Sequence, residues 1–388
     1  GSGAQMFKLK DFDGNEFDSE YVAKRLRNEP IVEITQIKGT SDTHPALSKN
    51  DEWADFEIMP WKVATMEISK VEGGSYVREA LLNGLKLELE GKGNPFKFGF
   101  IGSTDGHTAA SSLDEENYFA KVGLLDSTPE LRGSIPITTQ ALLERGDSPI
   151  TGGSFQKDID GKKYVNASSI SYGASGLAAV WAEENTRESI YSALRRKEAF
   201  ATSGPRIKVR FFAGYDFNNE MINDENLIKH LYEKGHSMGS DILNTIKKSE
   251  PEFFVWAVQD ADSAPLQRLQ VIKGYVEDGE IKEIVFDVAC SDGLDVNPNN
   301  YRCPDNGAQV NLDDCSYDSS TGSSELKTFW NDPTYIKGQR VFYYVRVLEN
   351  PTCRWSTWDA LRNNVEPRSD YPKTIQERAW SSPIHLLP

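Results

Sequence analysis

The sequence has no long apolar run and few of the motifs that announce a function. No run reaches the roughly 18 to 20 apolar residues that cross a bilayer, and the first residues lack the apolar centre of a signal peptide. There is no Walker loop and no GxGxxG after an expected strand, and Gly173-Ala-Ser175-Gly176 is one residue short of a nucleophile elbow. We therefore expect no membrane span and none of these chemistries.

Positive charge is also scarce. The 388 residues contain 43 Lys and Arg against 59 Asp and Glu, a formal net charge of -16. Such a chain repels the phosphate backbone of nucleic acids and anionic membrane surfaces, so we expect a small-molecule substrate and no nucleic-acid partner. The 38% of hydrophobic residues supply enough apolar material for folded cores, and the length suits two domains.

The four cysteines all lie in the C-terminal part of the chain, and none is in a CxxC zinc pattern. Their even number within a loop-rich stretch predicts two disulfides and hence an oxidising compartment, periplasmic or secreted. Of the three possible pairings we expect Cys303 with Cys315, which closes a short loop, and Cys290 with Cys353. The alternative is four buried, reduced thiols.

Hydrophobic patterning divides the chain near residue 206. Before it, β-branched or aromatic runs at 30–38 and 96–101 alternate with helical stretches at 19–28, 61–89 and 186–197, which is the rhythm of a parallel α/β layer or barrel. A Gly-, Ser- and Asp-rich stretch at 145–172 predicts a long loop or a small hairpin. From 207 onward, alternating apolar and polar runs predict an antiparallel sandwich, with a hairpin turn at 277–280.

Asp105 and His107 are the strongest candidates for chemistry. They follow a buried strand in FGFIGSTDGHT, and the carboxyl ends of parallel strands form the active face of α/β barrels. Carboxylate and imidazole together suit zinc, manganese or iron; the alternative is a hydrogen-bonded pair in a solvated loop. Glu33 is a single acid in an apolar strand, where it must be paired, protonated or bound, either as a metal ligand or as an ion-pair partner.

Two further stretches are weaker candidates. Asp42 and His44 are also two residues apart, but in a polar stretch that favours an ordinary loop. Ser203 and Gly204, with Arg206, offer backbone N–H groups and a guanidinium to an anionic substrate; a turn between domains is the alternative.

Long blocks of the sequence, among them FGFIGSTDGHTAASSLDEENYFAKVG and ASGLAAVWAEENTRESIYSALRRKEAFATSGPRIKVRFFAGYDF, resemble the family called domain of unknown function 3604. That family is similar to the polymerase-and-histidinol-phosphatase (PHP) hydrolases, whose fold is a distorted (β/α) barrel. The resemblance implies a partial barrel of PHP type at 1–206, followed by an antiparallel β-sandwich domain at 207–388.

The resemblance also gives Asp105 and His107 a role. They match the last metal motif of the PHP pattern, a strand followed by Ser or Thr, then D-x-H. We therefore expect them to be catalytic metal ligands in a metal-dependent hydrolase, with phosphate esters as the first substrate class. The alternatives are a hydrolase of another substrate and a non-catalytic secreted binding or structural module.

The chain departs from the PHP pattern because it contains no H-x-H motif. Its first residues resemble the sequence that follows the third His motif of the family. We expect the missing ligands to come from an upstream half of the same protein or from a homo-oligomer that completes the barrel.

Overall fold

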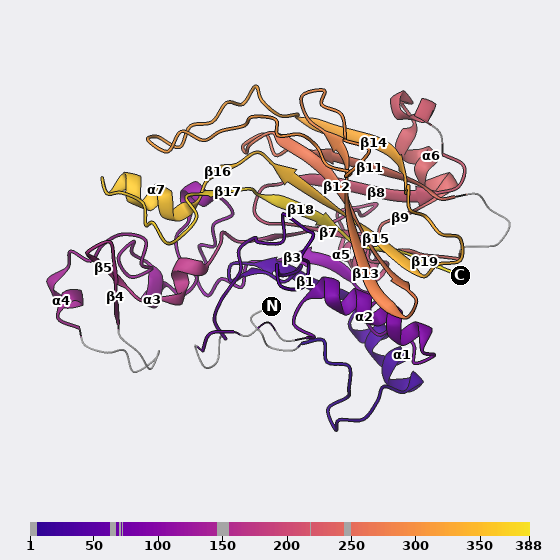
Figure 1. The fold of residues 1–388 in the computed structure, drawn as a ribbon, viewed down its shortest axis with the longest axis horizontal. Helices are drawn as coiled ribbons and strands as arrows, with labels where there is room; N and C mark the ends of the chain where they lie inside the picture. Colours follow the sequence, from indigo (N-terminus) through magenta and orange to yellow (C-terminus); the bar gives the residue numbers. More distant parts are fainter. Residues whose placement is uncertain are drawn as a thin grey trace.

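The computed structural model describes residues 6–62, 67–69, 71, 73–145, 155–217, 219–243 and 250–388. These residues form a mixed structure of helices and mainly antiparallel sheets, and no sheet among them closes into a barrel. The sheets stack as layers, with helices α1 (Ser19–Asn28) and α2 (Val77–Leu89) below them in the view of Figure 1. The part of the predicted α/β layer that is present is a small sheet rather than a barrel.

That small sheet has the order β2-β1-β3. Strand β1 (Ile31–Gln36) pairs in parallel with β3 (Gly99–Gly102), and in antiparallel fashion with β2 (Gly39–Thr40). The predicted strands at 30–38 and 96–101 are therefore confirmed, with small changes at their ends. Because β1 and β3 are parallel, the residues that follow them emerge at the same edge of the sheet.

Two of the three predicted helices have nearly the predicted bounds. Helix α1 begins after Asp18, whose carboxylate accepts the N–H of Tyr21 at 2.7 Å. Helix α5 (Arg187–Arg195) begins after Thr186, whose hydroxyl accepts the N–H of Ser189 at 3.3 Å. The predicted helix at 61–89 is wrong in its first half, because α2 begins only at Val77 and Trp61 instead forms a β-bridge with Ile68. Gly73 and Gly74 precede α2, and glycine disfavours helix.

The largest sheet has eight strands, and a second has four. The eight are β6 (Leu177–Val180), β7 (Ala199–Thr202), β10 (Asp241–Leu243), β12 (Leu266–Glu277), β13 (Glu280–Cys290), β15 (Val341–Glu349), β18 (Arg378–Ser381) and β19 (Ile384–Leu387). The four, in the order β14-β11-β8-β9, are β8 (Lys208–Gly214), β9 (Gly235–Ser237), β11 (Glu252–Val258) and β14 (Glu325–Asn331).

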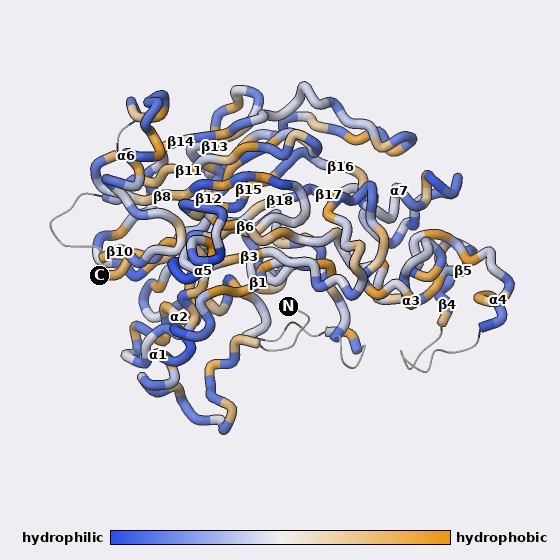
Figure 2. The backbone as a smooth tube through the Cα atoms, turned by 180° about the vertical axis from the view of Figure 1, so that it is seen from behind, coloured by the Kyte–Doolittle hydropathy of each residue, from blue (hydrophilic) through white to orange (hydrophobic). Residues whose placement is uncertain are grey.

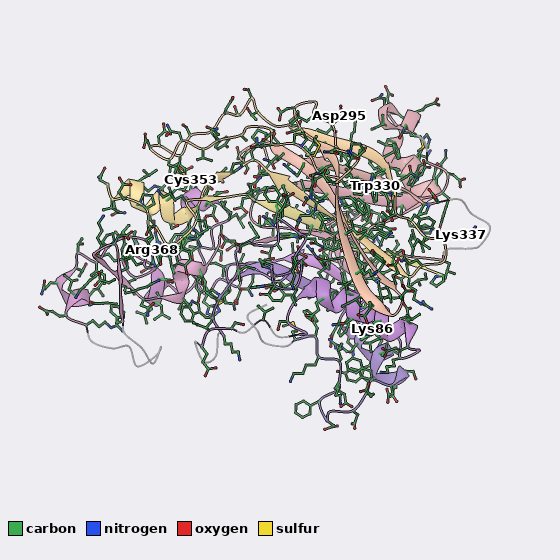
Figure 3. All side chains as sticks on the ribbon, viewed as in Figure 1. Lys86, Asp295, Trp330, Lys337, Cys353 and Arg368 are labelled. Carbon is green, nitrogen blue, oxygen red and sulfur yellow. A yellow bond between two sulfur atoms is a disulfide. The ribbon has the colours of Figure 1, made fainter. Side chains whose placement is uncertain are left out.

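The two sheets pack through one apolar core, to which β8 and β11 contribute from one side and β12, β15 and β19 from the other. Figure 2 shows the hydropathy of the residues along these strands, and Figure 3 labels Trp330 of β14, which packs against this core. The predicted hairpin turn is confirmed, since Asp278 and Gly279 both have positive φ between β12 and β13.

The large sheet includes strands from both sides of the predicted boundary at residue 206. Strand β7 pairs with β18, through Ala201 and Trp380 among others, and β6 pairs with β7. Strands β6 and β7 therefore extend the sheet that the sequence placed entirely after residue 206.

A smaller group of elements lies at one end of the molecule, away from α1 and α2 (Figures 1 and 2). It comprises the short helices α3 (Gly123–Asp126) and α4 (Gln140–Leu143), the hairpin of β4 (Gln156–Ile159) and β5 (Lys162–Val165), and helix α7 (Trp355–Arg362). The hairpin confirms one reading of the stretch at 145–172, of which residues 146–154 lie outside the described part. Within this group Arg132 binds α7, because its Nε donates to Asp359 at 2.6 Å.

All four cysteines form disulfides, as predicted, but the predicted pairing is wrong. The bonds are Cys290–Cys303 and Cys315–Cys353, each with Cα atoms 5.6 Å apart. The chain after β13 folds back on that strand, and the N–H of Cys303 donates to Asp287 at 2.7 Å. This course of the chain places Cys303 beside Cys290. Cys315 therefore pairs with Cys353 of the short strand β16 (Thr352–Cys353).

A buried ionic network joins the N-terminal part to the large sheet. Asp51 accepts from Arg78 at 2.8 Å and from Arg346 of β15 at 2.7 and 2.9 Å, and all three side chains are buried. Asp42 accepts from Arg78 at 3.0 Å and from the Tyr344 hydroxyl at 2.6 Å. Asp42, the weak candidate from sequence, is therefore a structural residue.

We expect Asp51→Asn to lower the free energy of unfolding by about 3 to 5 kcal/mol, because two buried guanidinium groups lose their shared carboxylate. Burial opposes ionisation of Asp51, but Arg346 and Arg78 outweigh it and hold its pKa far below the usual range. Its stabilisation is thus complete above the unfolded-state pKa of about 3.9 and is lost as pH falls below it. Urea unfolding between pH 3 and pH 7 measures this, with exposed Asp13→Asn as the matched control.

Non-reducing peptide mapping of the disulfides is expected to recover the 290–303 and 315–353 pairs. Removing Cys315–Cys353 by a double Ser substitution should cost about 1 kcal/mol more than removing Cys290–Cys303, since it closes a 38-residue rather than a 13-residue separation. Recovery of a 303–315 peptide would contradict the structure.

Candidate functional site

Asp105 and His107 lie together just beyond the carboxyl end of β3. Ser103 directly follows β3, and its N–H donates to the carbonyl of Thr35 on β1 at 3.0 Å. The imidazole Nε2 of His107 is 3.4 Å from Oδ1 of Asp105. Asp105 has a φ of +46°, so the backbone turns sharply there. The structure thus brings the two strongest sequence candidates into direct contact.

Two lysines surround this pair. The ammonium of Lys38, two residues beyond β1, forms an ion pair with Asp105. The ammonium of Lys121 lies 2.8 Å from His107 Nε2 and 3.2 Å from Asp105 Oδ2, and it donates to the Asp105 carbonyl at 2.8 Å. Because an ammonium has only donors, His107 Nε2 accepts from Lys121 and carries a lone pair.

The charges of the site shift one another's ionisation. Burial opposes ionisation of Asp105, but the hydrogen bonds and charges of Lys38 and Lys121 outweigh it and lower the pKa of Asp105. Burial lowers the pKa of Lys121, and Asp105 partly offsets that effect. Asp105 is thus held as a carboxylate between two cationic groups.

Glu33 lies on β1 next to this pair but outside their direct contact. It pairs in register with Ile101 of β3 and is partly buried. Burial raises the pKa of Glu33, a hydrogen bond with Gln36 lowers it, and the Asp105 charge raises it further. The charge of Asp105 therefore affects the ionisation of Glu33.

The geometry of Asp105 and His107 suits two ligands of one metal ion. Two donors that bind a tetrahedral ion at about 2.1 Å lie about 3.4 Å apart, and the observed separation is 3.4 Å. Within the described ranges, however, no group of three or more His, Cys, Asp or Glu side chains is arranged to hold a metal. The lone pair that would bind an ion also accepts from Lys121, so the ion and this ammonium contact are mutually exclusive.

The predicted anion-binding group lies elsewhere, beside buried carboxyl groups. Ser203 donates its hydroxyl to Glu377, and the Gly204 N–H donates to the Thr202 hydroxyl at 3.3 Å. The side chain of Arg206 is exposed, and its backbone N–H donates to Asp260 at 2.6 Å. These donors are engaged by the chain's own oxygens, and the structure does not bring them into contact with Asp105.

Sequence reasoning missed Lys38 and Lys121. Lys38 carried a usable signal, since it follows the end of a strand parallel to the one that precedes Asp105. Lys121 carried none, because it is 14 residues from His107 and reaches it only through the fold of the intervening loop, where the His107 N–H donates to the Lys121 carbonyl at 2.7 Å.

The remaining histidines form no comparable centre. His230 pairs with Asp224 at 3.1 Å on the partly exposed face of α6 (Leu227–Lys234). His385 of β19 is buried, and burial lowers its pKa to about 3. None of the helices in the described residues is long and apolar enough to cross a membrane.

Comparison with known proteins gives one match. The family model described as protein of unknown function (DUF3604) covers residues 1–388. Neither the curated proteins nor the solved structures include a match to the chain.

Asp105→Asn is expected to lower the free energy of unfolding by no more than about 1 kcal/mol, because Asp105 is 27% exposed and its ion pairs are partly screened. Asparagine also tolerates the positive φ at this position. Urea unfolding beside Asp51→Asn checks this. A loss as large as that of Asp51→Asn would mean that Asp105 is a structural rather than a functional residue.

Proposed function

The chain belongs to the DUF3604 family, and we propose that it carries part of the centre of a metal-dependent hydrolase related to the PHP enzymes, with phosphate esters as the first substrate class. The observation that carries the proposal is the contact between Asp105 and His107, at the spacing of two ligands of one ion, at the edge where parallel strands end. The partial PHP-type barrel is part of this proposal.

In this proposal Asp105 and His107 hold a zinc, manganese or iron ion, which supplies Lewis-acid activation of water and of the phosphoryl oxygen. The Asp105 carboxylate is held ready for that role, because Lys38 and Lys121 keep it ionised. His107 Nε2 lies 3.4 Å from Asp105 Oδ1 and 2.8 Å from the Lys121 ammonium, at the position from which it would bind the ion.

The lysines favour an anionic substrate. Lys38 and Lys121 place two ammonium groups at the pair, within a chain whose overall charge is negative. When Lys121 leaves His107, its ammonium becomes available to a phosphoryl oxygen, as a point charge that neutralises the substrate. We therefore place phosphate esters ahead of neutral esters and amides as substrates.

Two protein ligands hold a divalent ion weakly, because affinity depends on ligand number and fixed geometry. We propose that further ligands come from another segment of the protein or from a second copy of the chain, with Glu33 as a possible contributor from β1. The two disulfides suit a periplasmic or secreted location.

The test is metal content per chain by elemental mass spectrometry, together with turnover of p-nitrophenyl phosphate. We expect bound zinc, manganese or iron, and we expect Asp105→Ala with His107→Ala to lose both the metal and the turnover. The matched control is Asp224→Ala with His230→Ala, which removes an Asp–His pair whose side chains are 3.1 Å apart beside α6.

Metal and turnover that survive the Asp105 and His107 substitutions would contradict the proposal. So would a chain that binds no metal even with its second copy or its other segment present. The second result would favour a non-catalytic binding or structural module instead.

A further inference from the structure

Three buried glutamates converge on a small inner cavity that the proposed hydrolase centre does not use. The cavity is lined by Glu57, Glu115 and Glu377, with Gly173 in its wall, and has room for about one water-sized group. Glu115 and Glu377 are 6% and 4% exposed, and the Glu57 side chain is 9% exposed. The three come from distant parts of the sequence, so only the fold brings them together.

The carboxyl groups are incompletely satisfied by the chain itself. Oε2 of Glu57 is buried and has no hydrogen-bond partner among the described residues, while its Oε1 is 3.4 Å from Arg354 Nε. Glu115 accepts the N–H groups of Ala174 and Trp355 at 3.0 and 2.6 Å. The cavity therefore presents an unpaired carboxylate oxygen, and burying such an oxygen is costly unless a donor reaches it.

A second, larger cavity of about 350 Å³ lies on the other side of two of these glutamates. Glu115 and Glu377 line both cavities, and the outer walls include the carboxylates of Asp114 and Asp262 and the aromatic rings of Tyr317 and Trp358. It lies beside β16 and α7 (Figure 1), where Figure 3 labels Cys353. Its volume is that of a small-molecule site, and five of its fifteen lining residues are acidic and two are aromatic.

We propose that this pair of cavities binds a ligand with a primary ammonium group, whose nitrogen donates to Glu57, Glu115 and Glu377 while the rest of the ligand occupies the outer cavity. A primary ammonium is water-sized and has three N–H donors for three carboxylates. The aromatic rings of the outer cavity suit the adjoining alkyl chain or a second cationic group.

The raised pKa values of two of the glutamates agree with a site for a cation. Burial, followed by the charge of Glu57, raises the pKa of Glu115 to about 7. Burial, followed by the charge of Glu115, raises the pKa of Glu377 well above its usual range. A bound ammonium favours the ionised carboxylates, so its binding should release protons.

Other charged side chains lie near the three glutamates and also affect the binding of a cation. Arg354 contacts Glu57, but its guanidinium also donates to Ser356 and to two backbone carbonyls. Arg378 is close enough to Glu377 for their charges to interact. Glu349, with a pKa raised to about 8 by burial, adds a further acid beside Glu377. Arg206 at the outer rim is a cation that opposes binding.

Isothermal titration of the full chain with putrescine tests the proposal at 150 mM salt and pH 7.5. We expect putrescine to bind, and 1,4-butanediol, of the same length without charge, not to bind. The bis-trimethylammonium form of putrescine keeps the charge but lacks N–H donors and is too large for the inner cavity, so it should bind at least about tenfold more weakly. Titration in two buffers of different ionisation enthalpy should show proton release.

Two substitutions test whether Glu377 and the inner cavity are needed for putrescine binding. Glu377→Gln removes one carboxylate and should weaken putrescine binding at least about tenfold, whereas exposed Glu220→Gln, with the same change of charge, should not. Gly173→Ala places a Cβ 2.9 Å from Glu57 Oε2 and fills the inner cavity. Its matched control is Gly123→Ala, where the nearest side-chain atom is 3.6 Å away.

Equal binding of the three probes to the unaltered chain, or no binding of putrescine, would overturn the proposal, even if a variant fails to fold. Unchanged affinity in both folded variants would overturn it too. Because Asp105 and His107 are absent from this cavity, their double substitution should leave putrescine binding intact, which separates the outcome from that of the hydrolase test.

Discussion

The shared carboxylate of Asp51 is the interaction on which the arrangement of this chain most depends. It binds Arg78 of α2 and Arg346 of β15 at the same time, in a place from which water is excluded. Removing Asp51 would leave two buried guanidinium groups short of a partner, although Arg78 still contacts Asp42, and this is far costlier than a lost surface ion pair. The helix, the loop that carries Asp42 and Asp51, and the large sheet are therefore fixed relative to one another by a single set of charges.

This network also determines where the candidate site lies. Nine residues connect helix α2 to β3, and Asp105 and His107 follow β3. An apolar cluster that includes Val77, Leu81 and Phe100 packs α2 and β3 against Tyr344 and Trp380 of the large sheet. The small parallel sheet is thus held on a rigid antiparallel scaffold, which is the arrangement that keeps functional side chains in a fixed geometry.

Local patterns in the sequence predicted local structure well. The strands that became β1 and β3, the helices α1 and α5, and the Asp278-Gly279 turn were all predicted, because each depends on neighbouring residues. The disulfide pairing was not readable, because it depends on how the chain after β13 folds back on Asp287. The inclusion of β6 and β7 in the large sheet is likewise a long-range pairing, with β18 as the partner, that no local pattern encodes.

The candidate site, too, was only partly predictable from the sequence. The contact between Asp105 and His107 followed from their position after a strand, whereas Lys121 reaches them through a loop whose course the sequence does not reveal. The three buried glutamates could not be identified from the sequence for a further reason. Glu57, Glu115 and Glu377 lie far apart in a chain with 59 acidic residues, and most such residues are solvated surface groups. The fold alone brings these three around one cavity.

Net charge was informative about surfaces but not about these two sites. The value of -16 argues against polyanionic partners over the whole molecule. Yet Asp105 is flanked by two ammonium groups, while the cavity near α7 gathers carboxyl groups around an unpaired oxygen. Since buried charges interact more strongly than solvated ones, a few residues override the mean within a few ångströms. The two proposals therefore place an anion at the edge of β1 and β3 and a cation in the cavity, within one acidic chain.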